Sequence, residues 1–504
     1  MWMSQQMRSL RRLAGAVPIL GLSLVLGWTF QARAHEPHVV GTIGDLPVLP
    51  GHVSQDAISD GSLGLQEIFN AGAVLFETRF NALDGAGRPT ATGSGTPTVR
   101  SEREFPQNFN RSSGPDTNSC VGCHNKPRRA GGGDNVANAF VLAELTEFTT
   151  SIGPSTADER NPLGLFGSGA IEMLAREMTA DLHRLRDEAL AEASGTGQPV
   201  TRALVTKTVD FGAITAFPDG SVDTGQVEGV DADLIIRPFG LKGVHVSLRV
   251  FSNNAMNHHH GMQSSERFGD GIDFDGDGII DELSRGDITA VTIFQAAQAI
   301  PGQKIPARPR VARAILRGED LFQAIGCASC HVPAMILDTP IFSEPGPFNP
   351  PGNLTPGEVP APFTFDLTRE GPLPRLEPIS GGKAIVRAFT DLKRHHIGAA
   401  LAEQLPQRGV PGDMFLTKKL WGFASEPHFL HHGRATLIGE AILLHGGEAQ
   451  AARDAFAALS SDEQADIIEF LRSLVVLPEP TSARVVDERN RPIDKAALRG
   501  RPGF

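Results

Sequence analysis

Hydrophobic residues recur at the spacing of an amphipathic helix in several separate stretches of this 504-residue chain. The predicted helices cover residues 65–83, 170–193, 288–299 and 311–325. One more helix is expected near the C-terminus, because Ser460 and Glu463 form a capping box ahead of an apolar run. Residues 205–250 instead alternate apolar and polar positions, which predicts a β-ribbon. The pattern therefore predicts a mainly α-helical fold with long loops and a small β-ribbon insertion.

The first residues of the chain have the pattern of a secretory signal peptide. Three arginines precede an apolar stretch over residues 14–28, and an A-x-A cleavage site ends at Ala34. The alternative is a membrane anchor, but the apolar stretch is short for a spanning helix and ends at a good cleavage site. We therefore expect a signal peptide over residues 1–34 and a mature chain that begins at His35.

Two C-x-x-C-H motifs use all 4 cysteines of the chain. The motifs are Cys120-Val121-Gly122-Cys123-His124 and Cys327-Ala328-Ser329-Cys330-His331. In this motif two thiols attach a haem covalently, and the following histidine ligates its iron. A zinc site would need further cysteines or histidines at close spacing, and a dithiol redox pair would not explain the histidines. The sequence thus predicts two covalent c-type haems in an oxidising compartment, the periplasm.

The motifs and the proline-rich residues 301–309 divide the mature chain into two unequal cytochrome c-like haem units. The first unit is expected over residues 35–300 and the second over residues 308–478. Residues 479–504 are polar, contain several prolines and are expected to form a tail.

Charge and hydropathy limit the partners that the mature protein can have. The formal net charge is -12, which argues against a nucleic-acid partner. No stretch after the signal has about 20 consecutive apolar residues, so stable membrane insertion is not expected.

An acidic loop before the proline-rich residues 301–309 has the alternating carboxylates of a calcium-binding loop. Asp273, Asp275 and Asp277 occupy its first, third and fifth positions, and a glycine follows at the sixth. The twelfth position is a serine, so Asp281 or Glu282 would have to complete the site. The alternative is a plain acidic turn.

Segments around both motifs and near the C-terminus resemble the bacterial di-haem oxidoreductase family, which includes peroxidase-like members. The resemblance covers most of residues 60–478. It rests on the runs 110–127 and 318–333, on Leu420-Trp421-Gly422, on His432-Gly433-Arg434-Ala435 and on residues 440–449. More distantly, the chain is similar to di-haem cytochrome c peroxidases, MauG-type enzymes and di-haem rubber oxygenases. The resemblance implies that one haem reacts with peroxide or oxygen while the other relays electrons.

The resemblance also implies a distal iron ligand at the second haem. The matching position, which is Met or Tyr in relatives, is His445 here, and the chain has 0 tyrosines. His445 is therefore expected to ligate the second iron, with Met414 and Met335 as alternatives. The alternative interpretation is that His445 is a histidine at a helix C-terminus, where it interacts favourably with the helix dipole.

At the first haem the chain departs from the peroxidases, because residues 125–140 contain no histidine. The first iron is then open, or a distant residue caps it. By resemblance, Pro162 and Glu172 match the distal segment, with Glu172 as general acid/base; the alternative is a surface helix glutamate. The candidate caps are His258, His259, His260, His395 and His396.

These expectations lead to a periplasmic di-haem oxidoreductase that is peroxidase-like. Electrons from a small redox protein or another donor would enter at the second haem and reach peroxide or oxygen at the first. Relatives often relay electrons through a tryptophan, and Trp421 is the one tryptophan after the signal. The alternatives are a non-catalytic electron-transfer cytochrome and a di-haem oxygenase or protein-oxidising enzyme.

Overall fold

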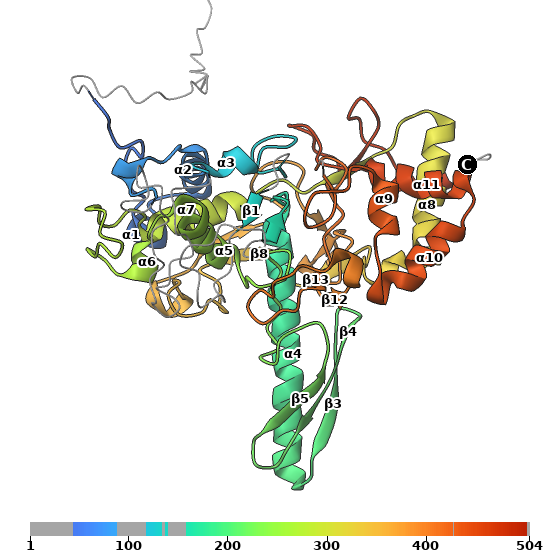
Figure 1. Cartoon of the computed structure of the whole chain (residues 1–504), viewed down its shortest axis with the longest axis horizontal. Coiled ribbons are helices and arrows are strands. Elements are labelled where there is room, and N and C mark those ends of the chain that lie inside the picture. The colour runs from blue at the N-terminus through green and yellow to red at the C-terminus, as the bar shows by residue number, and fades with distance from the viewer. Residues whose placement is uncertain (1–43, 88–116, 134–136, 140–157, 427, 501–504) are drawn as a thin grey trace, which may run out of the picture. The chain divides into compact units, whose positions relative to one another are not determined.

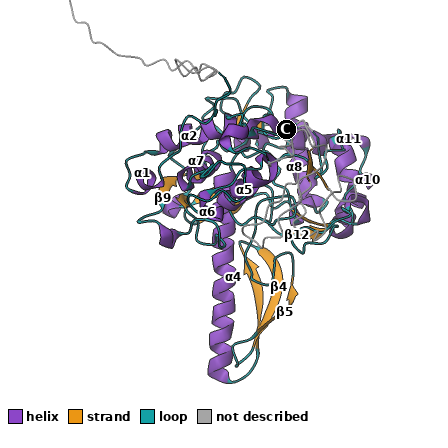
Figure 2. Ribbon diagram, turned by 60° about the vertical axis from the view of Figure 1, so that its left-hand side comes forward, coloured by secondary structure: helices purple, strands orange, loops and turns teal. Residues whose placement is uncertain are grey.

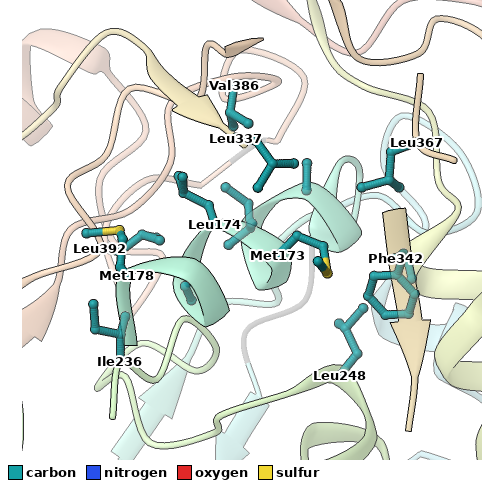
Figure 3. Close-up of a cluster of buried hydrophobic side chains, with 14 of the residues drawn as sticks. Met173, Leu174, Met178, Ile236, Leu248, Leu337, Phe342, Leu367, Val386 and Leu392 are labelled. Carbon is teal, nitrogen blue, oxygen red and sulfur yellow. The ribbon is translucent and has the colours of Figure 1, made fainter. Parts of the chain in front are cut away.

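The computed structural model describes residues 44–87, 117–133, 137–139, 158–426 and 428–500 (Figure 1). The predicted signal peptide lies outside the described residues. From Asp45 onward the chain forms one compact unit. Its largest hydrophobic core brings residues of helix α4 (Ser168–Thr196), such as Met173 and Leu174, against Leu337, Phe342 and Val386 (Figure 3). The two predicted haem units thus share a core, and the boundary between them stays a prediction.

A first group of helices surrounds the first haem motif. It contains α1 (Gln55–Ser59), α2 (Leu65–Glu77), α3 (Cys120–Cys123), α5 (Leu248–Ala255), α6 (Ser265–Phe268) and α7 (Arg285–Ala296). Helices α2 and α7 cross closely, because a Cβ at Gly72 would overlap the carbonyl oxygen of Ala290. Helix α5 continues into a π-helical turn, Met256–His260.

The long helix α4 (Ser168–Thr196) packs along a three-stranded antiparallel sheet (Figures 1 and 2). The sheet has the order β3 (Val200–Thr206), β4 (Val209–Ala216) and β5 (Val222–Val227). It corresponds to the expected β-ribbon but begins earlier and ends at Val227. Ser168, at the start of α4, lies near the first haem motif.

A second group of helices surrounds the second motif. It contains α8 (Pro309–Ala324), α9 (Ile438–Leu443), α10 (Gln450–Ala458), α11 (Ser461–Ser473) and α12 (Lys495–Arg499). The predicted capping box is present at the start of α11, where the Ser460 side chain accepts from the Glu463 N–H. Helices α8 and α11 cross at Gly318, where a Cβ would overlap the Asp466 carbonyl oxygen.

The expectation of a mainly α-helical fold is wrong. Helices contain 36% of the described residues and strands contain 16%, and the strands are spread over several small sheets. Besides the α4-associated sheet, the strands are β1 (Ala137–Ala139), β2 (Asp158–Arg160), β6 (Gly302–Lys304), β7 (Met335–Leu337), β8 (Ile341–Glu344), β9 (Phe363–Asp366), β10 (Glu377–Pro378), β11 (Ala384–Val386), β12 (Arg394–His396), β13 (Met414–Leu416), β14 (Leu474–Val475) and β15 (Val485–Val486). Most of these strands have two to four residues, too few for alternation to stand out in a sequence window. Among the helices of the described segments, none is long and apolar enough to cross a membrane.

Candidate functional site

The two C-x-x-C-H motifs have nearly the same local structure. In each, the histidine N–H donates to the carbonyl of the first cysteine, at 2.9 Å for His124 and 3.0 Å for His331. A phenylalanine from the preceding long helix lies beside each imidazole. The ring centroids are 6.3 Å apart for Phe76 and His124, and 6.2 Å apart for Phe322 and His331. The short motif therefore builds the same half-site twice.

Both motif histidines are held in the form that binds a metal. Nδ1 of His124 lies 3.2 Å from the Gly131 carbonyl, and Nδ1 of His331 lies 3.1 Å from the Phe389 carbonyl. A carbonyl only accepts, so Nδ1 carries the proton and Nε2 keeps its lone pair. Burial lowers the pKa of each histidine to about 4. The imidazoles are thus neutral, as an iron ligand must be.

The motif cysteines are poor candidates for thiolate chemistry. The four cysteines form no disulfide with one another. Burial raises the pKa of Cys120 to about 12 and that of Cys327 to about 11. A zinc knuckle or a reactive dithiol needs thiolates, which the burial of Cys120 and Cys327 disfavours. Covalent attachment of haem fits both motifs better.

A cavity of about 230 Å³ lies against the first motif. Cys120, Cys123 and His124 form one part of its wall, and the rest comes mainly from α5, the π-helical turn, α7 and the loops at 160–165 and 416–419. The wall is mostly apolar. Of the described residues that line it, none is an aspartate or a glutamate. The cavity suits a flat apolar cofactor and a small molecule next to it.

The π-helical turn brings three consecutive histidines, His258 to His260, to this cavity. Nδ1 of His260 lies 2.7 Å from the Thr117 carbonyl, and its Nε2 lies 3.6 Å from the Cys120 sulfur. The rings of His258 and His259 meet edge to face at 4.7 Å. His259 is near enough to contribute to the lowered pKa of His124, behind burial. Such turns are frequent at functional sites.

Of the two residues expected in the distal segment, only Pro162 lines the cavity. Glu172 is fully buried, so the surface alternative is wrong. One of its carboxylate oxygens pairs with Arg176, and the other accepts the Leu248 N–H at 2.8 Å. Its role as general acid/base stays a prediction, and this geometry offers it no route to the cavity because both oxygens are engaged.

One buried carboxylate near the first motif was missed by the sequence analysis. Glu426 is 4% exposed and lies 3.0 Å from Lys418. Burial would raise the pKa of Glu426, but Lys418 and Lys419 hold it below the usual value. A Cβ at Gly132 or Gly164 would meet its side chain, which explains two of the glycines nearby. In the sequence, Glu426 is only an isolated acidic residue several positions after Lys418 and Lys419.

At the second motif, the structure brings His445 close to His331. His445 follows α9, and its Nδ1 donates to the Ala441 carbonyl at 2.8 Å. Its Nε2 therefore keeps the lone pair. Burial lowers the pKa of His445, and His445 in turn helps, after burial, to lower that of His331. Of the alternatives, Met335 packs in the main core and Met414 pairs with His396 in a small sheet.

The other histidine pair cannot easily ligate iron. Nε2 of His395 lies 2.8 Å from Asp391, and its Nδ1 lies 2.6 Å from Glu448. Burial would lower the pKa of His395, but hydrogen bonds to Asp391 and to Cys330 outweigh it and raise the pKa to about 11. An imidazolium has no lone pair for a metal. His396 is half-exposed and pairs with Asp413 at 3.1 Å.

The acidic loop brings together Asp273, Asp275 and Asp277, with one oxygen of each within 4.8 Å of the others. Asp281 is not in this group, because its carboxylate accepts the Gly271 N–H at 2.7 Å. Glu282 is buried next to the loop. Burial, and then Asp275 and Asp277, raise the pKa of Glu282 to about 9. Three of the four predicted calcium ligands are therefore adjacent.

Trp421 lies between segments that belong to the two sites. Its ring lies 2.5 Å from where a Cβ of Gly167 would be, and Gly167 precedes Ser168 in the cavity wall. The backbone N–H of Trp421 approaches the carbonyl of Ala388, whose neighbour Phe389 accepts from Nδ1 of His331. The indole is 3% exposed, and its Nε1 has no hydrogen-bond partner within the described structure.

Comparison with known proteins identifies a family that resembles part of this chain. Residues 374–474 match the family model described as "Di-haem oxidoreductase, putative peroxidase". The resemblance drawn from the sequence is thereby confirmed, over a segment that holds Trp421 and His445 but neither C-x-x-C-H motif. No curated protein sequence matches the chain. A weak structural likeness exists to hydrazine synthase of Kuenenia stuttgartiensis pressurised with xenon, at 13% identity, over 87% of this chain and 100% of that chain, with a TM-score of 0.34.

Proposed function

We propose that the protein is a periplasmic di-haem oxidoreductase that reduces a peroxide at its first haem. The match of residues 374–474 to the di-haem oxidoreductase family supports the class of protein. The observation that carries the proposal is the cavity against His124, contrasted with the histidine that faces His331. One site has room beside its motif for a small oxidant, and the other has a ready sixth ligand.

The residues at both sites fit covalently attached haem. Cys120, Cys123 and His124 would hold the first group, and the second would be held by Cys327, Cys330, His331 and His445. Bound there, the first haem would supply redox chemistry toward a small oxidant, and the second would store and relay electrons. The protein's own part is to keep both proximal imidazoles neutral and oriented and to exclude bulk water from the cavity.

Trp421 is the proposed relay between the two sites. Its indole contacts Gly167 at the edge of the cavity wall, and its backbone contacts the segment that positions His331. The direction of electron flow, from a small redox protein through the second site to the first, belongs to this proposal. So does a calcium ion at Asp273, Asp275 and Asp277, which would hold the acidic loop in place.

A second candidate function is electron transfer without catalysis. It is favoured by the π-helical turn, because His259 lies close enough to His124 to affect its pKa. If one of these histidines ligates the first iron, both sites are closed to oxidants. The protein would then only carry electrons.

The reaction with hydrogen peroxide separates the two candidates. The haem-loaded protein, half-reduced with one electron, is mixed with peroxide in a stopped-flow spectrometer, with the oxidised protein as control. The enzyme proposal expects rapid, saturable oxidation with reduction of the peroxide to water. Slow bleaching of the haem absorbance, without turnover, would reject peroxide reduction in favour of the carrier.

A further inference from the structure

The first-haem cavity has no carboxylate in the part of its wall that the structure describes. Breaking the oxygen–oxygen bond of a peroxide requires a proton to move from one oxygen to the other, and a positioned side chain accelerates this step. Glu172 is engaged by Arg176 and by the Leu248 N–H, so it does not face the cavity. A different side chain must do this work if the proposed function holds.

His245 is a buried histidine of the cavity wall that belongs to neither haem motif. It is 5% exposed and lines the cavity just before α5. Its backbone pairs with Phe239 in both directions, at 3.2 Å each, and its ring meets the Phe251 ring edge to face at 5.6 Å. Both neighbours line the same cavity. The imidazole is thus fixed in place by backbone and by aromatic packing.

One ring nitrogen of His245, Nδ1, has no polar partner within the described residues. This atom is buried, and it neither accepts nor donates a hydrogen bond there. Buried polar atoms are nearly always paired, and an unpaired one calls for an explanation such as strain, a catalytic role or a bound water or ion. His260, one of the other buried imidazoles of the cavity wall, is satisfied by the Thr117 carbonyl.

The charge around His245 keeps its imidazole neutral. Burial lowers the pKa of His245 well below its usual value, and the charges of Arg408 and Arg267 lower it further. Arg267 is itself buried, and its Nε and Nη2 have no partner in the described part of the chain. A neutral imidazole can accept a proton, whereas an imidazolium cannot.

We propose that His245 is a catalytic residue of the first site, the general base that moves the proton of a bound peroxide. This rests on the proposed function. His245 accepts one proton from hydrogen peroxide and returns it to the far oxygen, which leaves as water when the oxygen–oxygen bond breaks. The remaining oxygen takes up two electrons from the donor and two protons from solvent and leaves as a second water. In the same way, His245 takes the proton of hydrogen cyanide as cyanide binds.

The test compares a protonated ligand with an unprotonated one in His245→Gln. Glutamine keeps much of the bulk of histidine but is not a base. We expect the rate constants for peroxide and for hydrogen cyanide to fall by about 10²- to 10⁴-fold. The rate constant for carbon monoxide, which brings no proton, should stay within about threefold. Haem content and spin state should match the wild type, which shows that folding and ligation are intact.

His183→Gln is the matched control. His183 lies on α4, where its Nε2 is 2.9 Å from the Asp233 carbonyl, and it does not line the cavity. This variant should behave as the wild type. Added imidazole should also restore part of the cyanide rate in His245→Ala, which gives a readout that does not depend on the glutamine variant.

Two results would overturn the role of His245. Equal cyanide and peroxide rates in His245→Gln and wild type would show that it is not the base. A change from low spin to high spin in His245→Gln would show that it is an iron ligand instead. Failure of the proposed function looks different, because then the wild type itself would react with neither cyanide nor peroxide.

Discussion

The two haem-motif regions share one half of their construction and differ in the other. In both, a long helix supplies a phenylalanine beside the motif histidine, whose Nδ1 donates to a backbone carbonyl. Beside this half-site, the first region has a cavity, and the second has His445 at the end of α9, close to His331. The five-residue motif therefore determines the proximal side only. The distal side depends on elements that arrive from far along the chain.

The largest expected effect comes from removing this difference at the second site. His445→Ala should convert one low-spin haem to high spin and leave the other unchanged, because it opens the position across from His331. Electron paramagnetic resonance of the oxidised protein measures this. His445→Met should stay six-coordinate and raise the reduction potential of that haem.

His396→Ala is the control for that experiment, since His396 is half-exposed and pairs with Asp413. An unchanged spectrum in His445→Ala would assign the sixth ligand to another residue. The proposed difference between the two regions would then depend on a residue other than His445.

A moderate effect is expected where each region's helices cross. Gly72→Ala and Gly318→Ala should each lower the free energy of unfolding by about 1–3 kcal/mol, because the new methyl group overlaps a backbone carbonyl. Gly195→Ala, in α4 with open space around it, should instead raise it by about 0.5–1 kcal/mol. Chemical denaturation of the three variants checks both signs. Equal effects at all three positions would show that close helix crossing does not support the motifs.

A third effect concerns the acidic loop, which is present only in the first region. The folded pKa of Glu282 is raised to about 9 from an ordinary value of 4.5, so the folded protein holds a proton that the unfolded chain releases. Without calcium, the melting temperature should therefore fall as the pH rises from about 4.5 to about 9. Added calcium should raise the melting temperature by mass action, and Asp275→Asn should reduce that gain.

Asp270→Asn, an exposed acid outside the three-carboxylate group, serves as the control there. If calcium changes the melting temperature of neither the wild type nor Asp275→Asn, the loop is an acidic turn and not a metal site.

The features that sequence could predict are those set by neighbouring residues. The motif spacing, the capping box at Ser460 and the long helices follow from local chemistry and periodicity. The small sheets did not emerge, because strands of two to four residues carry too little pattern. His245 and Glu426 were not predicted from the sequence either, because they are single residues whose burial and surroundings arise only from packing. Glu172 shows the same limit, since its position on α4 was clear but its pairing with Arg176 decides what it can do.

The central claim is that one site is open to a small ligand and the other is closed. Titration of the fully reduced, haem-loaded protein with carbon monoxide tests it most directly, by counting ligands bound per two haems. The account predicts one carbon monoxide per protein in the wild type and two in His445→Ala. Binding of none or of two by the wild type would contradict it.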